Sequence, residues 1–492
     1  MTLKTHWFRF LLLPLLVLGA NAEQSLKLSG LIRDNMVLQR ETEAPIWGWA
    51  EAGEKVEVTG SWDKKSIAAL ADADGKWTAI LKTPKAGGPF EIRVKGVAKE
   101  IDLKNVLSGE VWICGGQSNM QWKMRGFGLE QFADDVKKAD YPEIRLCTLP
   151  QILALEPQDD TNAPWQVCNP QTVLNFSAVG YFFGSQLHQE LGVPIGLISS
   201  NMGGSAAEAW ISEGTLREKF PIFSGTLDTY ATKAGKSGAV VKRGAPEFKG
   251  FGNQSPALLY NGMIAPLAPF AMKGVIWYQG ESNVKEPMQY RSLFPAVIEE
   301  WRSQWKQGDF PFYFVQIAPF LYKGNPYPAA LLREAQTMAL SVPETGMAVT
   351  MDIGEANNIH PKEKKPVGER LARLALARTY GQSELVDSGP MFREFKVEGD
   401  KIRLGFDHVG GGLTTNDEKP LTHFTIAGDD KVFHPADATF DRDTILVSSA
   451  KVRDPKAVRF GWGNTDDTNF VNEEGLPSPS FRTDDWPIEP AH

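Results

Sequence analysis

Ser118 stands where a strand-like segment gives way to a pair of glycines. The apolar run VWIC, residues 111–114, is followed by the stretch GGQSNM, residues 115–120. Glycine has no Cβ atom, so two of them allow a sharp turn that would present the serine at the start of the next element. Taken alone, the segment favours a serine that only caps a helix. With a base in reach, however, the same hydroxyl could act as a nucleophile.

Two further segments carry groups that could stabilise an oxyanion. Gly204 belongs to a glycine pair that follows the apolar run 195–200, and backbone N–H groups at glycines can donate to an anionic oxygen. Glu281 and Asn283 follow the run VIWY, residues 275–278. An amide is a good neutral donor and a carboxylate is a good orienter of imidazole. Each segment taken alone is typical of an ordinary loop.

His360 supplies a candidate base. The chain has 7 histidines, and apart from His188 in a predicted helix, His360 is the only one in the α/β part of the chain. A serine hydroxyl needs a base, a group that orients the base and donors for the oxyanion. Taken alone, His360 is equally well explained as a satisfied surface histidine. Together, the four segments offer a candidate for every role.

The elements around these segments predict how they are positioned. Between residues 109 and 381, apolar runs of strand length alternate with helical patterns such as 177–191 and 290–305. Continuous apolar strands between helices are typical of a parallel sheet covered on both faces. In such sheets ligands bind beyond the carboxyl ends of the strands. The sequence therefore predicts an α/β domain that brings the four segments to one edge.

Two β-domains are predicted on either side of this α/β domain. Short alternating segments separated by turns fill residues 26–107 and the chain beyond residue 388, as in small β-sandwiches. We interpret residues 123–164 and 213–255 as loop-rich excursions, which are often functional. The predicted divisions are a signal peptide 1–22, an N-terminal β-domain 23–107, a catalytic domain 108–385 and a C-terminal β-domain 386–492.

The first 22 residues predict a secretory signal peptide. Lys4 and Arg9 precede a short apolar core at residues 11–18, and Ala20-Asn21-Ala22 suits a cleavage site after Ala22. The apolar run is shorter than the roughly 20 residues needed to span a bilayer. We therefore expect a secreted or periplasmic protein with no membrane span after signal cleavage.

Charge and composition exclude other classes of protein. The formal net charge is -8 and lacks long like-charge runs, whereas nucleic-acid partners select basic faces. Neither an HExxH motif nor a cysteine-pair ligand set is present, and the chemistry outlined above requires no metal and no cofactor.

The 3 cysteines rule out a disulfide scaffold and leave room for at most one bridge. Cys147 with Cys168 is the expected pair. Cys114 lies in an apolar run and is predicted to be a buried small hydrophobe.

Four ordered motifs resemble a known family. The stretches GGQSNM, SNMGGSAAEAW, WYQGESN and IHPKEKKPVGERLA are similar to the sialate O-acetylesterase family, part of the SGNH-hydrolase superfamily and related to acetylxylan esterases. The resemblance covers nearly the whole mature chain. It implies an SGNH-hydrolase-like (flavodoxin-like) parallel sheet domain between two β-sandwich-like domains. It also implies an esterase that removes acetyl groups from O-acetylated sialic acid or acetylated polysaccharide.

The resemblance also implies roles for individual residues. Ser118 would be the nucleophile and His360 the general base. The oxyanion hole would be formed by Gly204 and Asn283 together with the Ser118 backbone N–H.

One position departs from the superfamily pattern. An aspartate commonly stands three residues before the histidine, but this chain has Asn357 there, which cannot serve as an anionic orienter. By similarity to related carbohydrate esterases, Glu281 takes that role, with Asp352 as the alternative acid. The same departure leaves a second hypothesis open, a catalytically inactive carbohydrate-binding protein.

Overall fold

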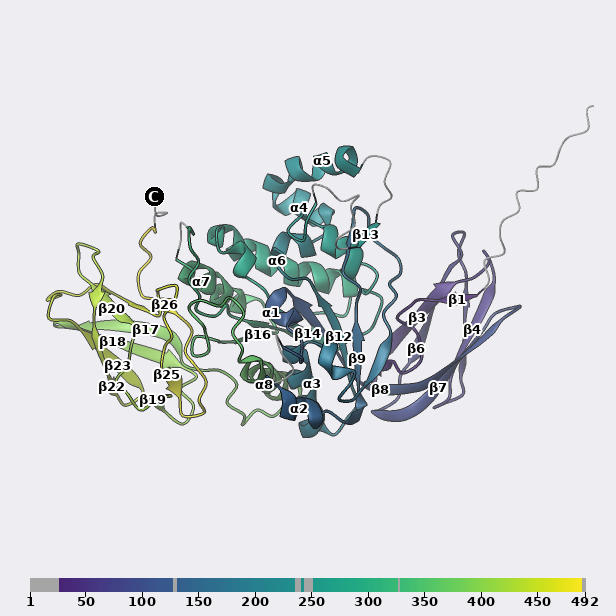
Figure 1. Cartoon of the computed structure of the whole chain (residues 1–492), viewed down its shortest axis with the longest axis horizontal. Helices are drawn as coiled ribbons and strands as arrows, with labels where there is room; N and C mark the ends of the chain where they lie inside the picture. The colour runs from purple at the N-terminus through teal and green to yellow at the C-terminus, as the bar shows by residue number, and fades with distance from the viewer. Residues whose placement is uncertain (1–25, 127–130, 235–239, 243–250, 326–327, 489–492) are drawn as a thin grey trace, which may run out of the picture.

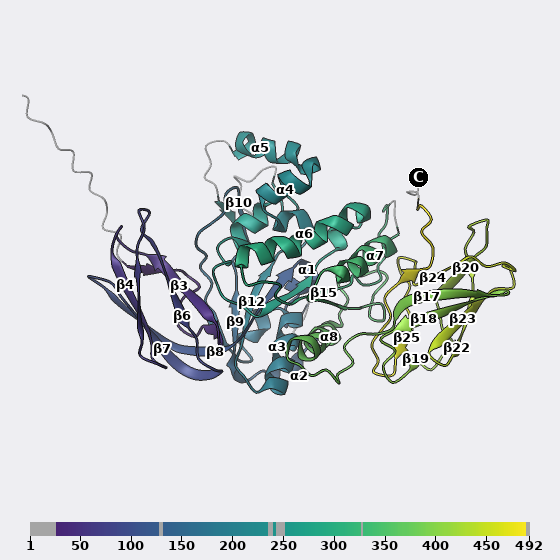
Figure 2. The same cartoon turned by 180° about the vertical axis from the view of Figure 1, so that it is seen from behind.

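The protein has three bodies in a row, shown by a computed structural model that describes residues 26–126, 131–234, 240–242, 251–325 and 328–488. A β-rich N-terminal body and a β-rich C-terminal body flank a central α/β body (Figure 1). The view from behind shows the same order (Figure 2). The signal peptide predicted over residues 1–22 lies outside the described residues.

The N-terminal body consists of antiparallel strands with alternating burial. In β6 every second residue is buried, as expected for a sheet with one face on a core and one in solvent. β3 pairs with β1 and β6, while β4 pairs with β5 and β7. The strands are β1 (Lys27–Leu28), β2 (Val37–Gln39), β3 (Glu43–Trp49), β4 (Lys55–Gly60), β5 (Ser66–Leu70), β6 (Lys76–Lys82) and β7 (Gly87–Lys95).

The strand β8 (Glu100–Gly116) belongs to both the N-terminal and the central body. Its first half pairs antiparallel with β7, and its second half pairs in parallel with β12 and β14. Burial along β8 changes from partial to continuous at the same point, because the central sheet is covered on both faces. The predicted boundary between residues 107 and 108 falls inside this strand.

The central sheet has the order β11-β9-β12-β8-β14-β15-β16. Its strands are parallel except for β11, which runs antiparallel to β9 at the edge. Chain order reverses at β8, so the ends of β8, β12 and β14 meet at a topological switch point. The central strands after β8 are β9 (Tyr141–Thr148), β11 (Trp165–Cys168), β12 (Ile195–Asn201), β14 (Gly274–Tyr278), β15 (Phe312–Val315) and β16 (Thr345–Ala348).

Helices cover both faces of this sheet. α6 and α7 contribute to the hydrophobic core on one face, and α3 and α8 to the core on the other (Figures 1 and 2). The predicted helical patterns at 177–191 and 290–305 are confirmed as α3 and α6. The helices are α1 (Ser118–Gln121), α2 (Ala133–Lys137), α3 (Ala178–Leu191), α4 (Glu213–Lys219), α5 (Ser224–Ala234), α6 (Pro287–Trp305), α7 (Ala330–Met338) and α8 (Lys364–Leu374). Among the described residues, no helix combines the length and the hydropathy needed to cross a bilayer.

The two segments interpreted as loop-rich contain regular structure. Residues 123–164 include α2, β9 and the short strand β10 (Ile152–Ala154), and β9 is a member of the central sheet. Residues 213–255 include α4, α5 and β13 (Val240–Lys242), which pairs with β10. Only the remainder of each segment is irregular.

The C-terminal body has small antiparallel sheets around a core of its own. It is attached to α7 by Arg333, which is fully buried and donates to the carbonyl oxygens of Gly461 (2.9 Å) and Gly463 (2.8 Å) and to Ser480 Oγ (3.1 Å). The strands are β17 (Met391–Glu398), β18 (Lys401–Asp407), β19 (Leu413–Thr415), β20 (Phe424–Ala427), β21 (His434–Pro435), β22 (Asp437–Asp441), β23 (Thr444–Ser448), β24 (Ala457–Phe460), β25 (Phe470–Asn472) and β26 (Phe481–Arg482).

All three cysteines are buried free thiols, so the expected bridge between Cys147 and Cys168 is wrong. In the β9–β11 ladder Cys147 lies opposite Trp165, whereas Cys168 lies opposite Tyr141. Tyr141 is six residues from Cys147 along β9, a distance of about 20 Å at the strand rise, far beyond disulfide reach. Burial raises the pKa of Cys168 to about 12, so this thiol stays protonated.

Candidate active site

Ser118 is the first residue of α1, directly beyond the end of β8. The turn between them needs glycine, because Gly116 has φ +125° and a Cβ there would lie 2.2 Å from the Tyr278 carbonyl oxygen. The N-cap of α1 is Gln117, whose side chain forms no cap bond. The serine therefore does not cap the helix, which corrects the expectation from this segment alone. None of the hydrogen bonds among the described residues uses its hydroxyl.

The glycine pair after β12 lies against Ser118. A Cβ on Gly203 would lie 3.5 Å from the Ser118 Cβ. Gly203 donates its N–H to Gln121 Oε1 (2.7 Å), and its carbonyl accepts from the Asn253 amide. Gly204 has φ +72°, and within the described chain no acceptor is found for its N–H. The N–H of Ser118 belongs to the first helical turn, which leaves such donors unsatisfied.

Asn283 ends the 3₁₀ turn η6 (Glu281–Asn283) after β14, and three contacts fix its amide. Its Oδ1 accepts from the Ala207 N–H (3.0 Å) and from Gln279 Nε2 (2.7 Å). Its Nδ2 donates to the Glu208 carboxylate (3.0 Å), and burial raises the pKa of Glu208. A primary amide carries two N–H groups, so one remains for another acceptor.

Glu281 is buried and contacts Asn119. Asn119 Nδ2 lies 2.5 Å from Glu281 Oε1 and 3.1 Å from the Ile359 carbonyl oxygen. The second oxygen of Glu281 is buried without a hydrogen-bond partner among the described residues. Burial raises the pKa of Glu281, although the Asn119 bond and the Lys364 charge act in the other direction. These bonds connect Glu281 to the His360 loop through Asn119.

Lys364 completes this buried network. Its Nζ donates to Asn119 Oδ1 (2.6 Å) and lies 5.6 Å from the ring centroids of both Trp122 and Tyr278. A buried ammonium is costly unless such partners replace its water. Burial lowers the pKa of Lys364 to about 7, against the raising effect of Glu281.

His360 is held mainly through its backbone. Asn358 Oδ1 accepts from the His360 N–H (3.0 Å), and Asn358 Nδ2 donates to the His360 carbonyl (2.8 Å). Glu355 accepts from the same Asn358 amide (3.1 Å). The imidazole is partly buried and tilted against Trp122, with ring centroids 5.6 Å apart. Burial and, to a smaller extent, the charge of Lys364 lower the pKa of His360, which favours its neutral form.

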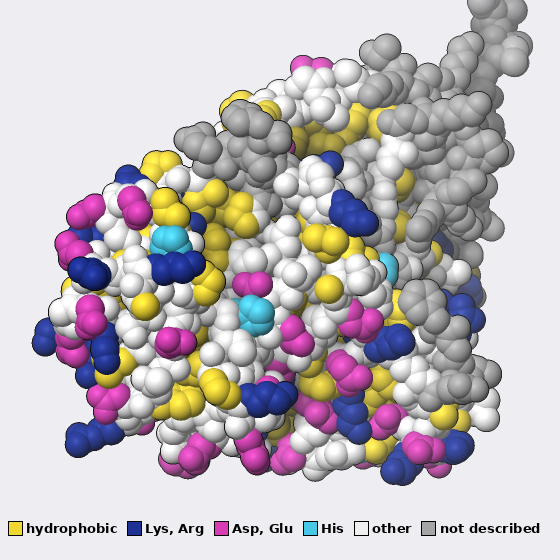
Figure 3. All heavy atoms as spheres, turned by 60° about the vertical axis from the view of Figure 1, so that its left-hand side comes forward, with side chains coloured by type: hydrophobic (Ala, Val, Ile, Leu, Met, Phe, Trp, Pro, Cys, Tyr) yellow, Lys and Arg dark blue, Asp and Glu magenta, His cyan; other side chains and the backbone are white. Residues whose placement is uncertain are grey.

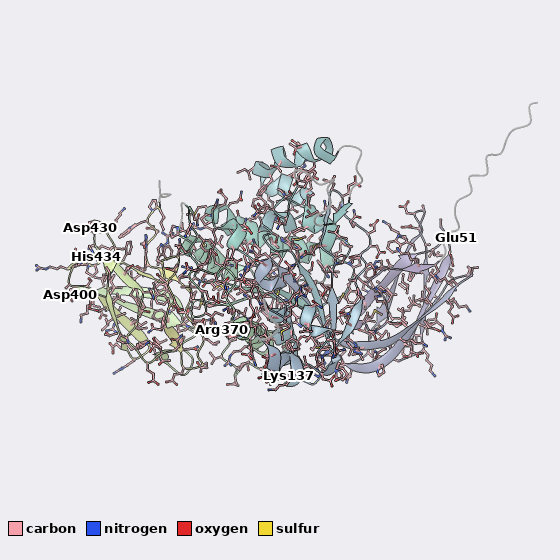
Figure 4. The ribbon with its side chains drawn as sticks, in the orientation of Figure 1. Glu51, Lys137, Arg370, Asp400, Asp430 and His434 are labelled. Carbon is pink, nitrogen blue, oxygen red and sulfur yellow. The ribbon has the colours of Figure 1, made fainter. Side chains whose placement is uncertain are left out.

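Asp352, the alternative acid, is paired with Arg370. Arg370 NH1 and NH2 donate to its two carboxylate oxygens at 2.8 and 2.6 Å. Arg370 lies in the central body, whereas His434 lies at the outer end of the C-terminal body (Figure 4). No hydrogen bond among the described residues joins the His360 ring to Ser118, Glu281 or Asp352.

The four sequence motifs therefore meet in the structure. Three of the residues that connect them, Asn119, Glu208 and Lys364, were given no role by the sequence analysis. Asn119 belongs to GGQSNM, Glu208 to SNMGGSAAEAW and Lys364 to IHPKEKKPVGERLA. The only sign in the sequence that these three residues matter was their position inside the motifs.

The described residues contain no group of three or more His, Cys, Asp or Glu side chains placed as metal ligands.

Comparisons with known proteins agree on one class of enzyme. The family described as "Carbohydrate esterase, sialic acid-specific acetylesterase" matches residues 108–377. The chain is 32% identical to human sialate O-acetylesterase, in an alignment that covers 77% of this chain and 76% of that protein. It is 30% identical to the rat sialate O-acetylesterase, in an alignment that covers 92% of each chain. The crystal structure of a carbohydrate acetylesterase from Xanthomonas citri has 39% identity and a TM-score of 0.82, covering 94% of this chain and 100% of that chain.

Proposed function

Because this chain belongs to the family of sialic acid-specific carbohydrate acetylesterases, we propose that it removes acetyl groups from O-acetylated sugars through a Ser118 nucleophile. The observation that carries the proposal is the 3.1 Å bond from Asn119 to the Ile359 carbonyl. It links the residue after the serine to the residue before the histidine. The ester hydrolase class follows from the relatives, and the serine mechanism is our inference.

In the first half-reaction the Ser118 oxygen attacks the acetyl carbonyl carbon. His360 takes the hydroxyl proton, and the oxyanion accepts hydrogen bonds from the Ser118 and Gly204 N–H groups and the Asn283 amide. The bond between the carbonyl carbon and the sugar oxygen then breaks. The imidazolium gives its proton to the departing sugar oxygen, which leaves an acetyl-serine.

In the second half-reaction water attacks the acetyl-serine. His360 takes a proton from the water and later returns one to the Ser118 oxygen, so acetate leaves and the serine is restored. In this scheme Glu281 positions the base through Asn119, because its carboxylate hydrogen-bonds that amide. Burial and the charge of Lys364 lower the pKa of His360, which favours the neutral form that a base requires.

Replacing Asn283 with alanine is expected to lower kcat by about 10²- to 10³-fold with a small change in KM. The Asn283 amide would stabilise the oxyanion of the transition state. The bound ester has no oxyanion, so its binding, and with it KM, should change little. Steady-state rates with a chromogenic acetyl ester measure both constants. Glu208→Gln is the matched control, because it keeps an acceptor oxygen for Asn283 while removing the carboxylate. A rise in KM at constant kcat would instead assign Asn283 to ground-state binding.

Replacing Lys364 with methionine is expected to move the acid limb of the pH profile of kcat/KM to higher pH. The charge on Lys364 lowers the pKa of His360, and below about pH 7 this lysine is protonated. Removing that charge raises the imidazole pKa, so the neutral base is lost at a higher pH. An equal loss of rate at every pH would show that Lys364 has only a structural role.

The class of reaction is tested by acetate release from O-acetylated sialic acid and from acetylated xylan. Release from at least one of them supports an O-acetylesterase. A fluorophosphonate probe, which reacts with activated serines, tests the alternative of an inactive carbohydrate-binding protein. That alternative predicts an unlabelled Ser118, and the relatives lend it no support.

We also propose export and a particular domain layout. The pattern of residues 1–22 supports a signal peptide, and a mature protein beginning at Glu23, measured by mass spectrometry, would confirm its cleavage. The reversal of strand order at β8 supports an SGNH-hydrolase-like centre over residues 108–385, between β-sandwich-like domains 23–107 and 386–492. Limited proteolysis with cuts inside these units would contradict the boundaries.

A further inference from the structure

The loop after β12 contains one main-chain donor without an acceptor in the described part of the chain. Met202 and Ser205 both donate their N–H groups to main-chain carbonyl oxygens, at 3.0 and 3.2 Å. Gly203 donates its N–H to the side-chain oxygen of Gln121 (2.7 Å). The N–H of Gly204 is the one that stays unpaired. An unpaired donor close to a nucleophile is what an oxyanion hole requires.

The peptide unit between Gly203 and Gly204 determines where this N–H points. The unit is trans, so its C=O and its N–H lie in one plane and point in opposite directions. The Gly203 carbonyl oxygen accepts a hydrogen bond from the side-chain amide of Asn253. The Gly204 N–H therefore points away from Asn253, and its direction is fixed as long as that bond is kept.

The two glycines make this peptide unit easy to turn over. Gly204 has φ +72°, and glycine adopts positive and negative φ about equally readily. The bond to Gln121 holds the Gly203 N–H, which belongs to the preceding peptide unit. A turned unit would place the Gly203 carbonyl where the N–H had been, and a carbonyl oxygen repels an oxyanion. A bond that selects one orientation therefore has a direct consequence for catalysis.

Asn253 is held beside the two glycines by a closed turn. A Cβ on Gly204 would lie 3.0 Å from the amide nitrogen of Asn253. The Gly252 N–H donates to the Ser255 hydroxyl (2.9 Å), and the Ser255 N–H donates back to the Gly252 carbonyl (2.9 Å). These two bonds enclose Asn253, so its side chain projects from a fixed stretch of backbone.

The same turn is anchored to α5 by one tyrosine. Tyr230 is 6% exposed, and its ring packs edge to face on Phe251 with centroids 5.2 Å apart. Its hydroxyl donates to the Pro256 carbonyl (2.8 Å). Tyr230 thus contacts the turn on both sides of Asn253. α5 lies at the top of the central body in Figure 1, so the excursion over residues 213–255 brings a side chain to the loop that carries Gly204.

We propose that Asn253 is a positioning residue of the oxyanion hole. Its amide holds the peptide unit 203–204 in the orientation that directs the Gly204 N–H to the oxyanion formed at Ser118. Donation to the carbonyl also polarises the peptide unit and strengthens its N–H as a donor. The inference rests on the proposed esterase function, and it adds a residue that lies in none of the four motifs.

The test compares Asn253→Ala with Asn253→Asp. Alanine removes the donor, but water can replace part of the lost bond, so we expect kcat for a chromogenic acetyl ester to fall about tenfold. Aspartate has nearly the same shape but only acceptor oxygens. It repels the Gly203 carbonyl and can accept from the N–H of the turned unit, so kcat should fall by about 10²-fold. KM should change little in both variants, because the bound ester has no oxyanion.

Inhibition by trifluoroacetone gives a readout that a merely structural role would not move. The Ser118 oxygen adds to the carbonyl carbon of this ketone while His360 takes the hydroxyl proton, and the product is a hemiketal with an anionic oxygen. The inhibition constant Ki should therefore rise by the same factors by which kcat falls. Titration with a fluorophosphonate probe counts the active molecules, so that kcat refers to folded protein only.

Gln254→Glu is the matched control for the added charge. Gln254 follows Asn253 directly, is exposed, and its side chain forms no hydrogen bond among the described residues. The chain has 60 acidic against 52 basic residues, and over the face drawn in Figure 3 the two kinds are interspersed without a large area of one sign. One more carboxylate on such a surface changes the field little, and salt screens it. This variant should keep kcat, KM and Ki.

Three results would overturn the proposal. The first is an unchanged kcat in both Asn253 variants, and the second is a rise in KM at constant kcat, which would make Asn253 a substrate-binding residue. The third is an equal loss of kcat in Gln254→Glu and Asn253→Asp. In each case Ser118-dependent turnover by the unmodified protein would leave the proposed function intact. A protein that hydrolyses no acetyl ester would refute the function and this inference together.

Discussion

Replacing Ser118 with alanine is expected to lower kcat/KM for acetyl-ester hydrolysis by about 10⁴-fold or more. The variant has no oxygen to accept the acetyl group, so only direct attack by water remains. The hydroxyl takes part in no hydrogen bond among the described residues, so its removal should change the thermal transition little. A chromogenic acetyl ester gives the rate, and a thermal melt shows that the fold is kept.

Ser282→Ala is the matched control for this experiment. Ser282 belongs to the neighbouring turn η6 and is partly buried like Ser118, but it contacts Gln117 through its backbone N–H. Loss of the Ser282 hydroxyl should leave kcat/KM within a few-fold of that of the unmodified protein. If Ser118→Ala retained turnover, Ser118 would be excluded as the nucleophile.

Replacing His360 with glutamine is expected to lower kcat/KM by a similar factor, about 10⁴-fold. Glutamine can still form hydrogen bonds but cannot accept the proton of the serine at neutral pH. The backbone bonds from Asn358 to His360 remain possible, so the loop should keep its shape. The variant should also lose labelling by a fluorophosphonate probe, because the serine is no longer activated.

His434→Gln is the control for the histidine. It makes the same chemical change at the outer end of the C-terminal body, away from the central body (Figure 4). Unchanged labelling and turnover in His360→Gln would show that another group takes the proton, and the base would have to be sought elsewhere.

Periodicity predicted the helices and strands that position the site. α3 and α6 have apolar faces long enough to give a clear helical pattern, and β8, β12 and β14 are continuous apolar runs of the kind buried on both faces. In contrast, β9 was interpreted as part of a loop. Its first half is exposed or partly exposed, and its second half is buried where it lies between β11 and β12 in the central sheet.

The motifs predicted which segments meet but not the bonds between them. The run PKEKKP contains three lysines, of which Lys362 and Lys365 are exposed and Lys364 is fully buried. Nothing in the local sequence distinguishes the buried one, because its partner is Asn119 of α1, more than two hundred residues away. The contact of Glu281 with Asn119 was missed for the same reason.

The strand β8 has a consequence for how substrate can enter. Many multidomain enzymes open and close by rotating one domain about a flexible linker. Here one continuous strand joins the N-terminal body to the central body and ends two residues before Ser118. It is hydrogen-bonded to β7 in the first body and to β12 in the second. A hinge at that junction would break the sheet. Movement that admits a glycan must therefore be sought in the loops above the strand ends and in the attachment of the C-terminal body.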